Sequence, residues 1–283
     1  MKSLCYNKNG DEMKDIAKKS NTMYLLDKYH LQASKKFGQN FLIDLNTIKK
    51  IVETTPIDKQ TCVIEIGPGI GALSEQLSYQ AGHVLCFEID ERLKDVLNES
   101  LGEFNNVEII FQDFLTVDLK QVVDELHQQY QKVCIVANLP YYITSNILEH
   151  IIVSGAKIDS IHAMVQKEVA LKLTDIHYKS PLTLMIESVG TISLDMNVSK
   201  NVFSPAPRVD SAIICIEINK AYNPLLTQLL KTAFTQKRKT IYNNLKILWN
   251  EETSDILQKC HIENQKRPEE LTIEDYQLLT KYL

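Results

Sequence analysis

The chain has 283 residues and a formal net charge of −5 at pH 7, with 44% hydrophobic and 24% charged residues. This globular composition excludes a disordered, collagen-like or coiled-coil protein. No stretch reaches the roughly 18 consecutive apolar residues that span a bilayer, and the N-terminal residues lack the apolar core of a signal peptide. We therefore expect a cytoplasmic protein without a membrane segment.

Residues 1–30 are polar and mixed in charge, which predicts either a flexible lead-in or a loosely docked helix. From about residue 60 to 165, short β-branched runs alternate with helical patterns. The predicted strands are Cys62–Ile66, His83–Glu88, Val107–Phe111, Lys132–Ala137 and Ser160–Val165. The predicted helices are Leu73–Ala81, Glu91–Glu99, Leu119–Tyr130 and Ser145–Ser154. This alternation predicts βαβ units, a parallel sheet and a ligand crevice at the carboxyl ends of its strands.

The pattern changes after residue 180. Strand-like runs at Thr183–Thr191 and Ala212–Ile218 flank a connection that contains two prolines. From Tyr222 onward no strand pattern occurs, and apolar residues recur at helical spacing, as in Leu225, Leu229 and Ala233. We predict an α/β domain that ends near residue 218 and a small helical domain after it.

The six cysteines include no CxxC pair, and four of them lie in short apolar runs. A cysteine in such a run is usually a small buried hydrophobe. We therefore expect reduced cysteines, without disulfides or a structural metal.

The cations are unevenly distributed along this acidic chain. The segment 224–250 contains five cations and no acid, and Lys35 and Lys36 form a second basic cluster. The five are Lys231, Lys237, Arg238, Lys239 and Lys246. A local basic face is typical of polyanion binding, although charge alone fits a solvated helix face equally well.

A glycine-rich segment, Glu65–Gly71 (EIGPGIG), joins the first predicted strand to a helix. Glycines at such a turn let the backbone approach a ligand closely. The spacing is GxGxG, whereas dinucleotide enzymes carry GxGxxG. The preceding acid, Glu65, suits a ligand with positive charge and would repel a diphosphate.

Acids also follow the next two strands. Glu88 ends the second strand and can accept both hydroxyls of a ribose, and Asp113, beside Phe114, can accept the amine of an adenine. Either acid alone fits a turn or cap residue. The ordered set of Glu65, Glu88 and Asp113 predicts a pocket for S-adenosylmethionine (SAM).

The fourth strand ends in Asn138-Leu139-Pro140-Tyr141. The exocyclic amine of adenine is a poor nucleophile, because its lone pair is delocalised into the ring. The amide oxygen of Asn138 and the carbonyl oxygen of Leu139 can each accept one N–H of that amine. Pro140 fixes the turn, and Tyr141 can stack on the base, worth about 1–3 kcal/mol. The motif predicts in-line methyl transfer to adenine N6, with positioning supplying much of the rate.

Several motifs in chain order resemble those of one family. They are KFGQNFL (36–42), EIGPGIG (65–71), NLPY (138–141), MVQKEV (164–169), FSPAPRVDS (203–211), FTQKRKTIYNNL (234–245) and RPEEL (267–271). From about Lys35 to Leu279, the chain resembles the KsgA/RsmA-type rRNA adenine N6,N6-dimethyltransferases. The segment after Glu168, roughly 170–181, is atypical for that family, so RNA docking there stays open.

The resemblance implies a Rossmann-like SAM-dependent methyltransferase domain over 35–218, an N-terminal extension over 1–34 and an all-α RNA-contacting domain over 219–283. The implied cofactor-binding residues are Asn40, Leu42, Gly67, Gly69, Glu88, Asp113 and Asn138. The implied catalytic residues are Asn138, Leu139, Pro140, Tyr141 and Phe203, the last of which would cover the second face of the base. The expected RNA-binding residues are Lys35, Lys36, Lys237, Arg238 and Lys239.

The implied substrate is a pair of adjacent adenosines in the 3′-terminal hairpin loop of small-subunit (16S) rRNA, within an immature 30S subunit. Each adenosine would receive two methyl groups from SAM. Bases in a loop leave their stack at low cost, so they can reach an enclosed pocket. We also expect a monomer that needs no metal.

Two other readings stay open at this point. An erythromycin-resistance-type enzyme would methylate a large-subunit rRNA adenine with similar motifs, but Leu139 and the 234–245 segment are nearer the small-subunit pattern. A non-catalytic ribosome assembly factor would keep the fold without the chemistry. This alternative does not explain why Asn138, Tyr141, Glu88 and Asp113 are all present.

Overall fold

A computed structural model of the chain describes residues 15–34 and 36–283. A seven-stranded sheet runs through the molecule in the order β4-β3-β2-β5-β6-β9-β7. The first five strands in this order are parallel, whereas β9 is antiparallel to both of its neighbours. The strands are β2 (Thr61–Ile66), β3 (His83–Glu88), β4 (Val107–Phe111), β5 (Lys132–Asn138), β6 (Ser160–Gln166), β7 (Gly190–Val198) and β9 (Ser211–Ile218).

The five parallel strands predicted from the sequence are confirmed to within one residue at each end. All six residues of β2 are buried, as expected for a central strand that is covered on both faces. A separate two-stranded ribbon pairs β1 (Phe41–Leu42) with β8 (Phe203–Ser204).

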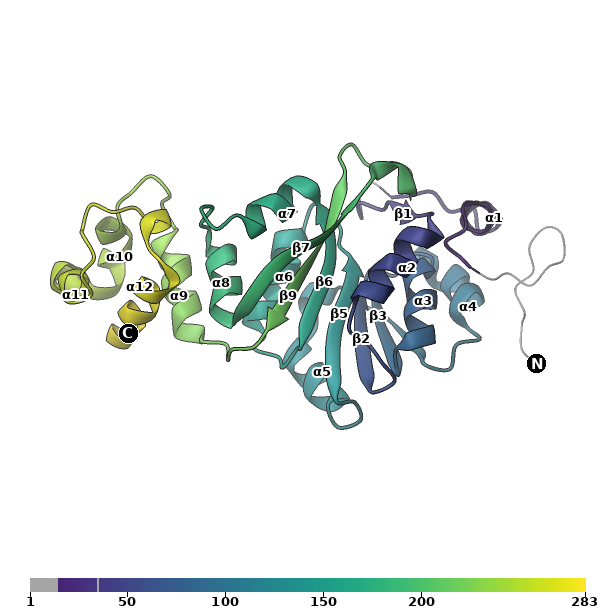
Figure 1. Cartoon of the computed structure of the whole chain (residues 1–283), viewed down its shortest axis with the longest axis horizontal. Coiled ribbons are helices and arrows are strands. Elements are labelled where there is room, and N and C mark those ends of the chain that lie inside the picture. The colour runs from purple at the N-terminus through teal and green to yellow at the C-terminus, as the bar shows by residue number, and fades with distance from the viewer. Residues whose placement is uncertain (1–14, 35) are drawn as a thin grey trace.

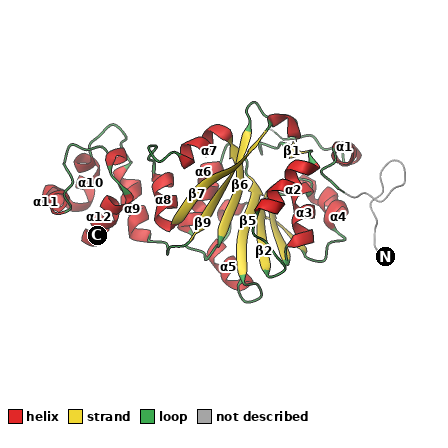
Figure 2. Cartoon of the chain, in the orientation of Figure 1, coloured by secondary structure: helices red, strands yellow, loops and turns green. Residues whose placement is uncertain are grey.

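Helices cover both faces of the sheet (Figure 2). Apolar side chains from the first four helices form one buried cluster, and those from the later helices form another on the opposite face. The helices of the first set are α1 (Lys19–Lys28), α2 (Leu45–Thr54), α3 (Ala72–Gln80) and α4 (Lys94–Leu101). On the opposite face lie α5 (Leu119–Leu126), α6 (Thr144–Val153), α7 (Lys167–Thr174) and α8 (Pro181–Val189).

The strand predicted over Thr183–Thr191 is wrong, because Pro181–Val189 forms helix α8 and the strand begins only at Gly190. Ser180 caps the helix: its side chain accepts the Thr183 N–H, and the Thr183 hydroxyl accepts the Ser180 N–H. Pro181 stands at the first helical position, where its missing N–H costs nothing. This local start signal outweighs the β-branched residues that suggested a strand.

The C-terminal part of the chain is helical, as predicted, with α9 (Pro224–Ala233), α10 (Ile241–Trp249), α11 (Thr253–Lys259) and α12 (Ile273–Leu279) at one end of the long axis (Figure 1). Leu226, Leu229 and Leu230 of α9 continue the buried cluster of the adjacent sheet face, whereas Leu225 is exposed. A domain division at 218/219 therefore stays a prediction.

The N-terminal segment is docked from residue 15 onward. The buried carboxylate of Glu75 on α3 accepts the backbone N–H groups of Asp15 at 3.0 Å and Ile16 at 2.8 Å. Of the two predictions for residues 1–30, the structure supports a docked helix for Lys19–Lys28, while residues 1–14 lie outside the described part. Among the described residues, no helix is long and apolar enough to cross a membrane.

Candidate active site

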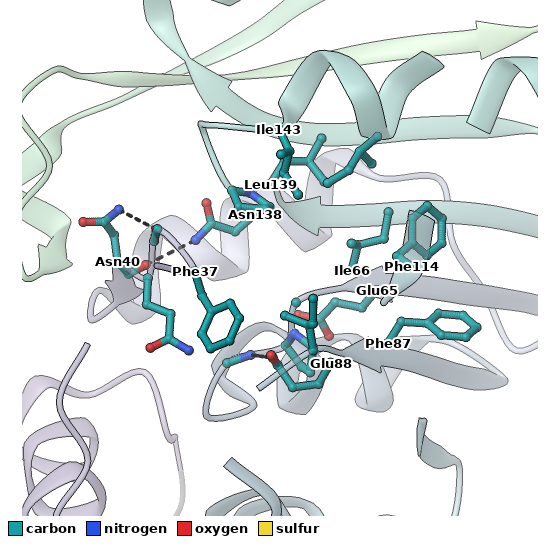
Figure 3. A pocket seen from close by; sticks show the side chains of 18 of the residues that line it. Phe37, Asn40, Glu65, Ile66, Phe87, Glu88, Phe114, Asn138, Leu139 and Ile143 are labelled. Atoms are coloured by element: carbon teal, nitrogen blue, oxygen red, sulfur yellow. Dashed lines mark hydrogen bonds between the residues drawn. The ribbon is translucent and has the colours of Figure 1, made fainter. Parts of the chain in front are cut away.

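A cavity of about 1100 Å³, counting its open mouth, lies at the carboxyl ends of β2, β3, β4 and β5. Its walls are the turns that follow these four strands, together with residues 37–42, which precede and include β1. Figure 3 shows side chains from all of these segments pointing toward the same space. Parallel strands bring their carboxyl ends to one edge of the sheet, so residues as far apart in the chain as Phe37 and Ile147 meet there.

The glycine loop lines one wall. Gly67 has φ 72° and Gly69 has φ 62°, both in the left-handed region that favours glycine. A Cβ built on Gly67 would meet no atom within 4 Å, so it would project into open space. No side chain therefore separates the Gly67 backbone from the cavity, as expected where a ligand lies close to the main chain.

Glu88 stands at the end of β3 with only 4% of its surface exposed. Its carboxylate accepts the backbone N–H of Gly69 at 3.2 Å and that of Asp90 at 2.9 Å. Burial outweighs these hydrogen bonds and raises the pKa of Glu88 to about 7. The carboxylate is therefore fixed in place, and its remaining lone pairs can accept ligand hydroxyls.

Asp113 follows β4 and lines the same cavity. Its Oδ1 accepts the N–H of Leu115 at 3.0 Å, while its Oδ2 accepts no hydrogen bond from any described residue. The buried ring of Phe114 is next to it in the chain and also lines the cavity. One free carboxylate oxygen beside an apolar slot matches an adenine with its amine.

Glu65 is the most deeply buried acid of the cavity, with 2% of its surface exposed. Burial raises its pKa to about 8, although the Ser74 hydroxyl stabilises the ionised form. The thiol of Cys86 lies 3.7 Å from its Oε2. A cationic ligand would favour the ionised form, so the pair Glu65 and Glu88 fits a positively charged nucleoside such as SAM better than a diphosphate.

The side chains of Asn138 and Leu139 lie on the opposite wall (Figure 3). The Asn138 side chain donates through Nδ2 to the Asn40 carbonyl oxygen at 3.3 Å. The N–H of Leu139 donates to the Met164 carbonyl on β6 at 3.1 Å. No described residue donates to Asn138 Oδ1 or to the Leu139 carbonyl oxygen. The Asn138 amide is thus held at its nitrogen, and two lining residues, Asn138 and Leu139, each keep an acceptor oxygen without a donor from the described residues.

The next two residues complete this wall. The Pro140 carbonyl accepts from the Ile143 N–H at 3.2 Å and the Thr144 hydroxyl at 3.1 Å, which closes the turn into α6. The Tyr141 hydroxyl is hydrogen-bonded to Ser211 Oγ at 2.6 Å, and the ring stays partly exposed. The tether fixes the ring plane, so a base could stack on it without ordering the side chain first.

The structure brings most of the expected residues together at this cavity. Those that line it are Asn40, Leu42, Gly67, Gly69, Glu88, Asp113, Asn138, Leu139, Pro140 and Tyr141. Phe203 does not line it: its ring is 3% exposed and packs in the core, because β8 pairs with β1. A role for Phe203 against the second base face is therefore not supported by this arrangement of β1 and β8.

The expected RNA-binding cations lie outside the cavity. Lys36 is exposed, with its ammonium 5.1 Å from the Phe37 ring centroid. Lys237, Arg238 and Lys239 are exposed in the connection between α9 and α10. Lys35 lies outside the described residues.

Sequence reasoning missed several residues of the cavity wall, among them Phe37, Gln39, Gln112 and Leu115. Gln39 donates from Nε2 to Asp90 Oδ2 at 2.8 Å and accepts the Ser34 N–H at 2.8 Å. Asp90 is also paired with Arg92, whose hydrogen bonds hold the pKa of this carboxyl below its usual range. Gln39 could have been predicted as a cavity residue because it lies inside the KFGQNFL motif, between residues that were predicted to line the cofactor site.

Comparison with known proteins agrees with this geometry. The family model for ribosomal RNA adenine dimethylase matches residues 30–283. The ribosomal RNA small subunit methyltransferase A of Oceanobacillus iheyensis is 40% identical over 277 residues, which cover 93% of this chain and 94% of the relative. The protein of the same name from Staphylococcus aureus (strain Newman) is 41% identical over 280 residues, with the same shares covered.

Solved structures are also similar. The 23S rRNA methyltransferase ErmE superimposes with a TM-score of 0.63 at 27% identity, over 86% of this chain and 99% of that one. A dimethyladenosine transferase from Plasmodium falciparum gives a TM-score of 0.68 at 22% identity, over 83% of this chain and 94% of that one. The second likeness shows the fold alone.

Proposed function

The chain belongs to the ribosomal RNA adenine dimethylase family, and we propose that it transfers methyl groups from SAM to N6 of adenosines in small-subunit rRNA. The observation that supports this most strongly is the pair of acceptors, Asn138 Oδ1 and the Leu139 carbonyl oxygen, at the same cavity as Glu65, Glu88 and Asp113. The curated relatives at 40–41% identity are named for the small subunit, which favours that substrate over large-subunit rRNA.

The residues of the cavity fit SAM by their chemistry. When bound, SAM supplies a methyl group on a positively charged sulfur. Glu88 would accept the ribose hydroxyls, Asp113 the adenine amine, and the bare backbone at Gly67 leaves space for the ligand. The two buried acids, Glu65 and Glu88, offset the positive charge that a cationic ligand brings into the fold.

The target base enters from the side of Asn138 and Tyr141. The Asn138 amide oxygen and the Leu139 carbonyl each accept one N–H of the amine, which returns electron density to the nitrogen and aims its lone pair. Tyr141 supports the base face, and its ring is fixed in advance by Ser211. Because both acceptors are preorganised, little rearrangement is needed when charge develops on the amine.

The finer identity of the substrate belongs to this proposal. We propose two adjacent adenosines of the 3′-terminal hairpin loop, each methylated twice, in an immature 30S subunit and by a cytoplasmic monomer. The proposed RNA contacts outside the cavity are Lys36 and the three cations of the α9–α10 connection. After the first transfer the amine keeps only one N–H, so one of the two acceptors must then tolerate a methyl group.

The test is methyl transfer from labelled SAM to three acceptors: under-methylated immature 30S subunits, fully methylated 30S subunits and naked 23S rRNA. We expect label only on the first, and mass spectrometry should place dimethyladenosine at two adjacent positions. Label on 23S rRNA would instead support an erythromycin-resistance-type substrate. Binding of under-methylated subunits without any transfer would contradict the enzymatic role.

A further inference from the structure

Three potential metal-ligating side chains meet on the sheet, away from the cavity. They are His162 on β6, Asp195 on β7 and Cys215 on β9, and one ligand atom from each lies within 4.8 Å of the other two. His162 pairs directly across the strands with Cys215. None of the three lines the candidate active site, so the proposed methyl transfer gives them no task.

Strand pairing places the carboxylate in this group. Ser193 of β7 pairs with Cys215 of β9, so the alternation of side chains puts Asp195, two residues on, on the face that carries Cys215 and His162. The pairing of β7 with β9 shifts between Leu194 and Met196, which leaves Asp195 as an extra residue without a partner on β9. Asp195 Oδ2 lies 3.9 Å from His162 Nδ1.

The hydrogen bonds around His162 determine which ring nitrogen is free. The Ser160 hydroxyl donates to Cys134 Sγ at 3.4 Å, so its oxygen is available to accept from His162 Nε2–H at 3.1 Å, and Cys215 Sγ lies 3.9 Å from the same nitrogen. Nδ1 then carries a lone pair. Nδ1 is the only fully buried side-chain nitrogen or oxygen without a hydrogen-bond partner in residues 15–34 and 36–283, and His162 is 3% exposed.

Two acids lie near this lone pair, and one of them, Asp195, is exposed and accepts the Ser193 hydroxyl at 2.9 Å. The carboxylates of Asp195 and Glu217 both face His162 and Cys215. Within the described residues, no lysine or arginine forms a salt bridge with either acid.

We propose that His162 Nδ1, Asp195 and Cys215 Sγ bind one divalent metal ion of the zinc type. Imidazole, thiolate and carboxylate together form a ligand set for Zn²⁺, and a tetrahedral ion would keep one position for water. Metal–ligand bonds of about 2.0–2.3 Å require the three side chains to close slightly around the ion. Ser160 would hold the ring from behind, as outer partners of zinc-bound histidines commonly do.

Binding must release a proton. Cysteine binds a metal ion as the thiolate, so the thiol must lose its proton. The Cys215 S–H bond breaks as the sulfur–metal bond forms, and the proton leaves to solvent. Affinity should therefore rise with pH. Because the site joins the outermost strand β7 to β9 and β6, the ion would stabilise this edge of the sheet and leave methyl transfer unchanged.

The experiment is a titration of the chelator-treated full-length protein with Co²⁺, which reports thiolate ligation by a near-ultraviolet charge-transfer band, followed by displacement with Zn²⁺. We expect one equivalent to bind. At about 100 times the dissociation constant, Zn²⁺ should raise Tm by about 5–10 °C. Cys215→Ala should abolish the charge-transfer band, and Asp195→Asn should weaken binding at least about tenfold.

Cys260→Ala is the matched control, since it removes a buried cysteine from the C-terminal helices and should keep the band. His162→Gln tests the ring nitrogen, and circular dichroism checks that each variant is folded. A band that persists in Cys215→Ala, or the absence of binding at 100 µM metal by a folded wild-type protein, would overturn the proposal. Retention of metal-dependent stabilisation in Asp195→Asn at wild-type affinity would do the same.

Discussion

The side chain of Asn138 is held by the backbone of a residue 98 positions earlier: its Nδ2 lies 3.3 Å from the carbonyl oxygen of Asn40. A carbonyl can only accept, so this contact assigns the Asn138 nitrogen to Asn40 and leaves Oδ1 as an acceptor without a donor among the described residues. The segment before β1 thus does more than cover the cofactor site, because it also sets the orientation of the proposed catalytic amide.

Asn138→Ala should lower the rate of methyl transfer by about 10²–10³-fold, the usual cost of removing one preorganised polar group from a reacting centre. SAM affinity should change little, because the amide acts mainly on the target amine. Single-turnover transfer to under-methylated 30S subunits and calorimetry with SAM measure the two effects. Asn146→Ala, an exposed position on α6, is the control and should behave as wild type.

Cofactor affinity should depend on pH through Glu88, whose pKa is raised to about 7 by burial. Ribose hydroxyls donate to the ionised form, so SAM should bind more tightly as pH rises, by up to about tenfold per unit below pH 7. Glu88→Gln should bind more weakly and lose this step. If calorimetry gives the same pH dependence of SAM affinity for wild type and Glu88→Gln, Glu88 does not bind the cofactor.

The stability of the ligand-free protein should fall with pH through Glu65. Its folded pKa of about 8 lies above the ordinary glutamate value of 4.5, so its contribution is complete below about 4.5 and is lost as pH rises through 8. Glu65→Gln, which stays neutral, should therefore gain stability relative to wild type as pH rises from 4.5 to 8, by up to roughly 5 kcal/mol in total. Thermal denaturation without SAM checks this; parallel pH profiles of the two proteins would contradict it.

Alanine substitutions at two glycines of the same loop should have different effects, one on SAM binding and the other on stability. Gly67→Ala places a Cβ in the open cavity, so it should block SAM binding while costing about 1–2 kcal/mol of stability for its positive φ. Gly71 has φ 91°, and a Cβ there would lie 2.8 Å from Leu101 Cγ. Gly71→Ala should therefore mainly lower stability, by about 2–4 kcal/mol. Urea denaturation and SAM titration of both variants separate the two effects.

Charge reversal of Lys237, Arg238 and Lys239 should weaken binding to under-methylated 30S subunits and reduce the salt slope of log K by up to about 3, near one for each lost phosphate contact. SAM binding should stay unchanged, because these residues lie outside the cavity. Lys259→Glu, an exposed position on α11, serves as control. An unchanged salt slope in the triple variant would place the RNA surface elsewhere.

The residues at the strand ends could be predicted from the sequence because each of them directly follows a short apolar run. In a parallel sheet the carboxyl ends of the strands lie at one edge, so these residues meet there. Glu88, Asp113 and Asn138 were therefore predictable together. The Thr183–Thr191 error had a local cause, since the Ser180 cap and Pro181 carry a helix signal that β-branched residues concealed. The cations at 237–239 were predicted as exposed, but only the packing of α9 and α10 shows that they stand in the connection between the helices.

The sequence by itself determined the order of the strands along the chain, the glycine loop, the acids that follow it and the residues of the methyl-transfer motif, because these depend on neighbours in the chain. The tertiary structure decided the orientation of Asn138, the burial of Phe203 beside β1, and the approach of Asp195 to His162. Each of these depends on contacts across strands or across long stretches of chain, where the register of a strand pair or a backbone carbonyl sets a side chain's position.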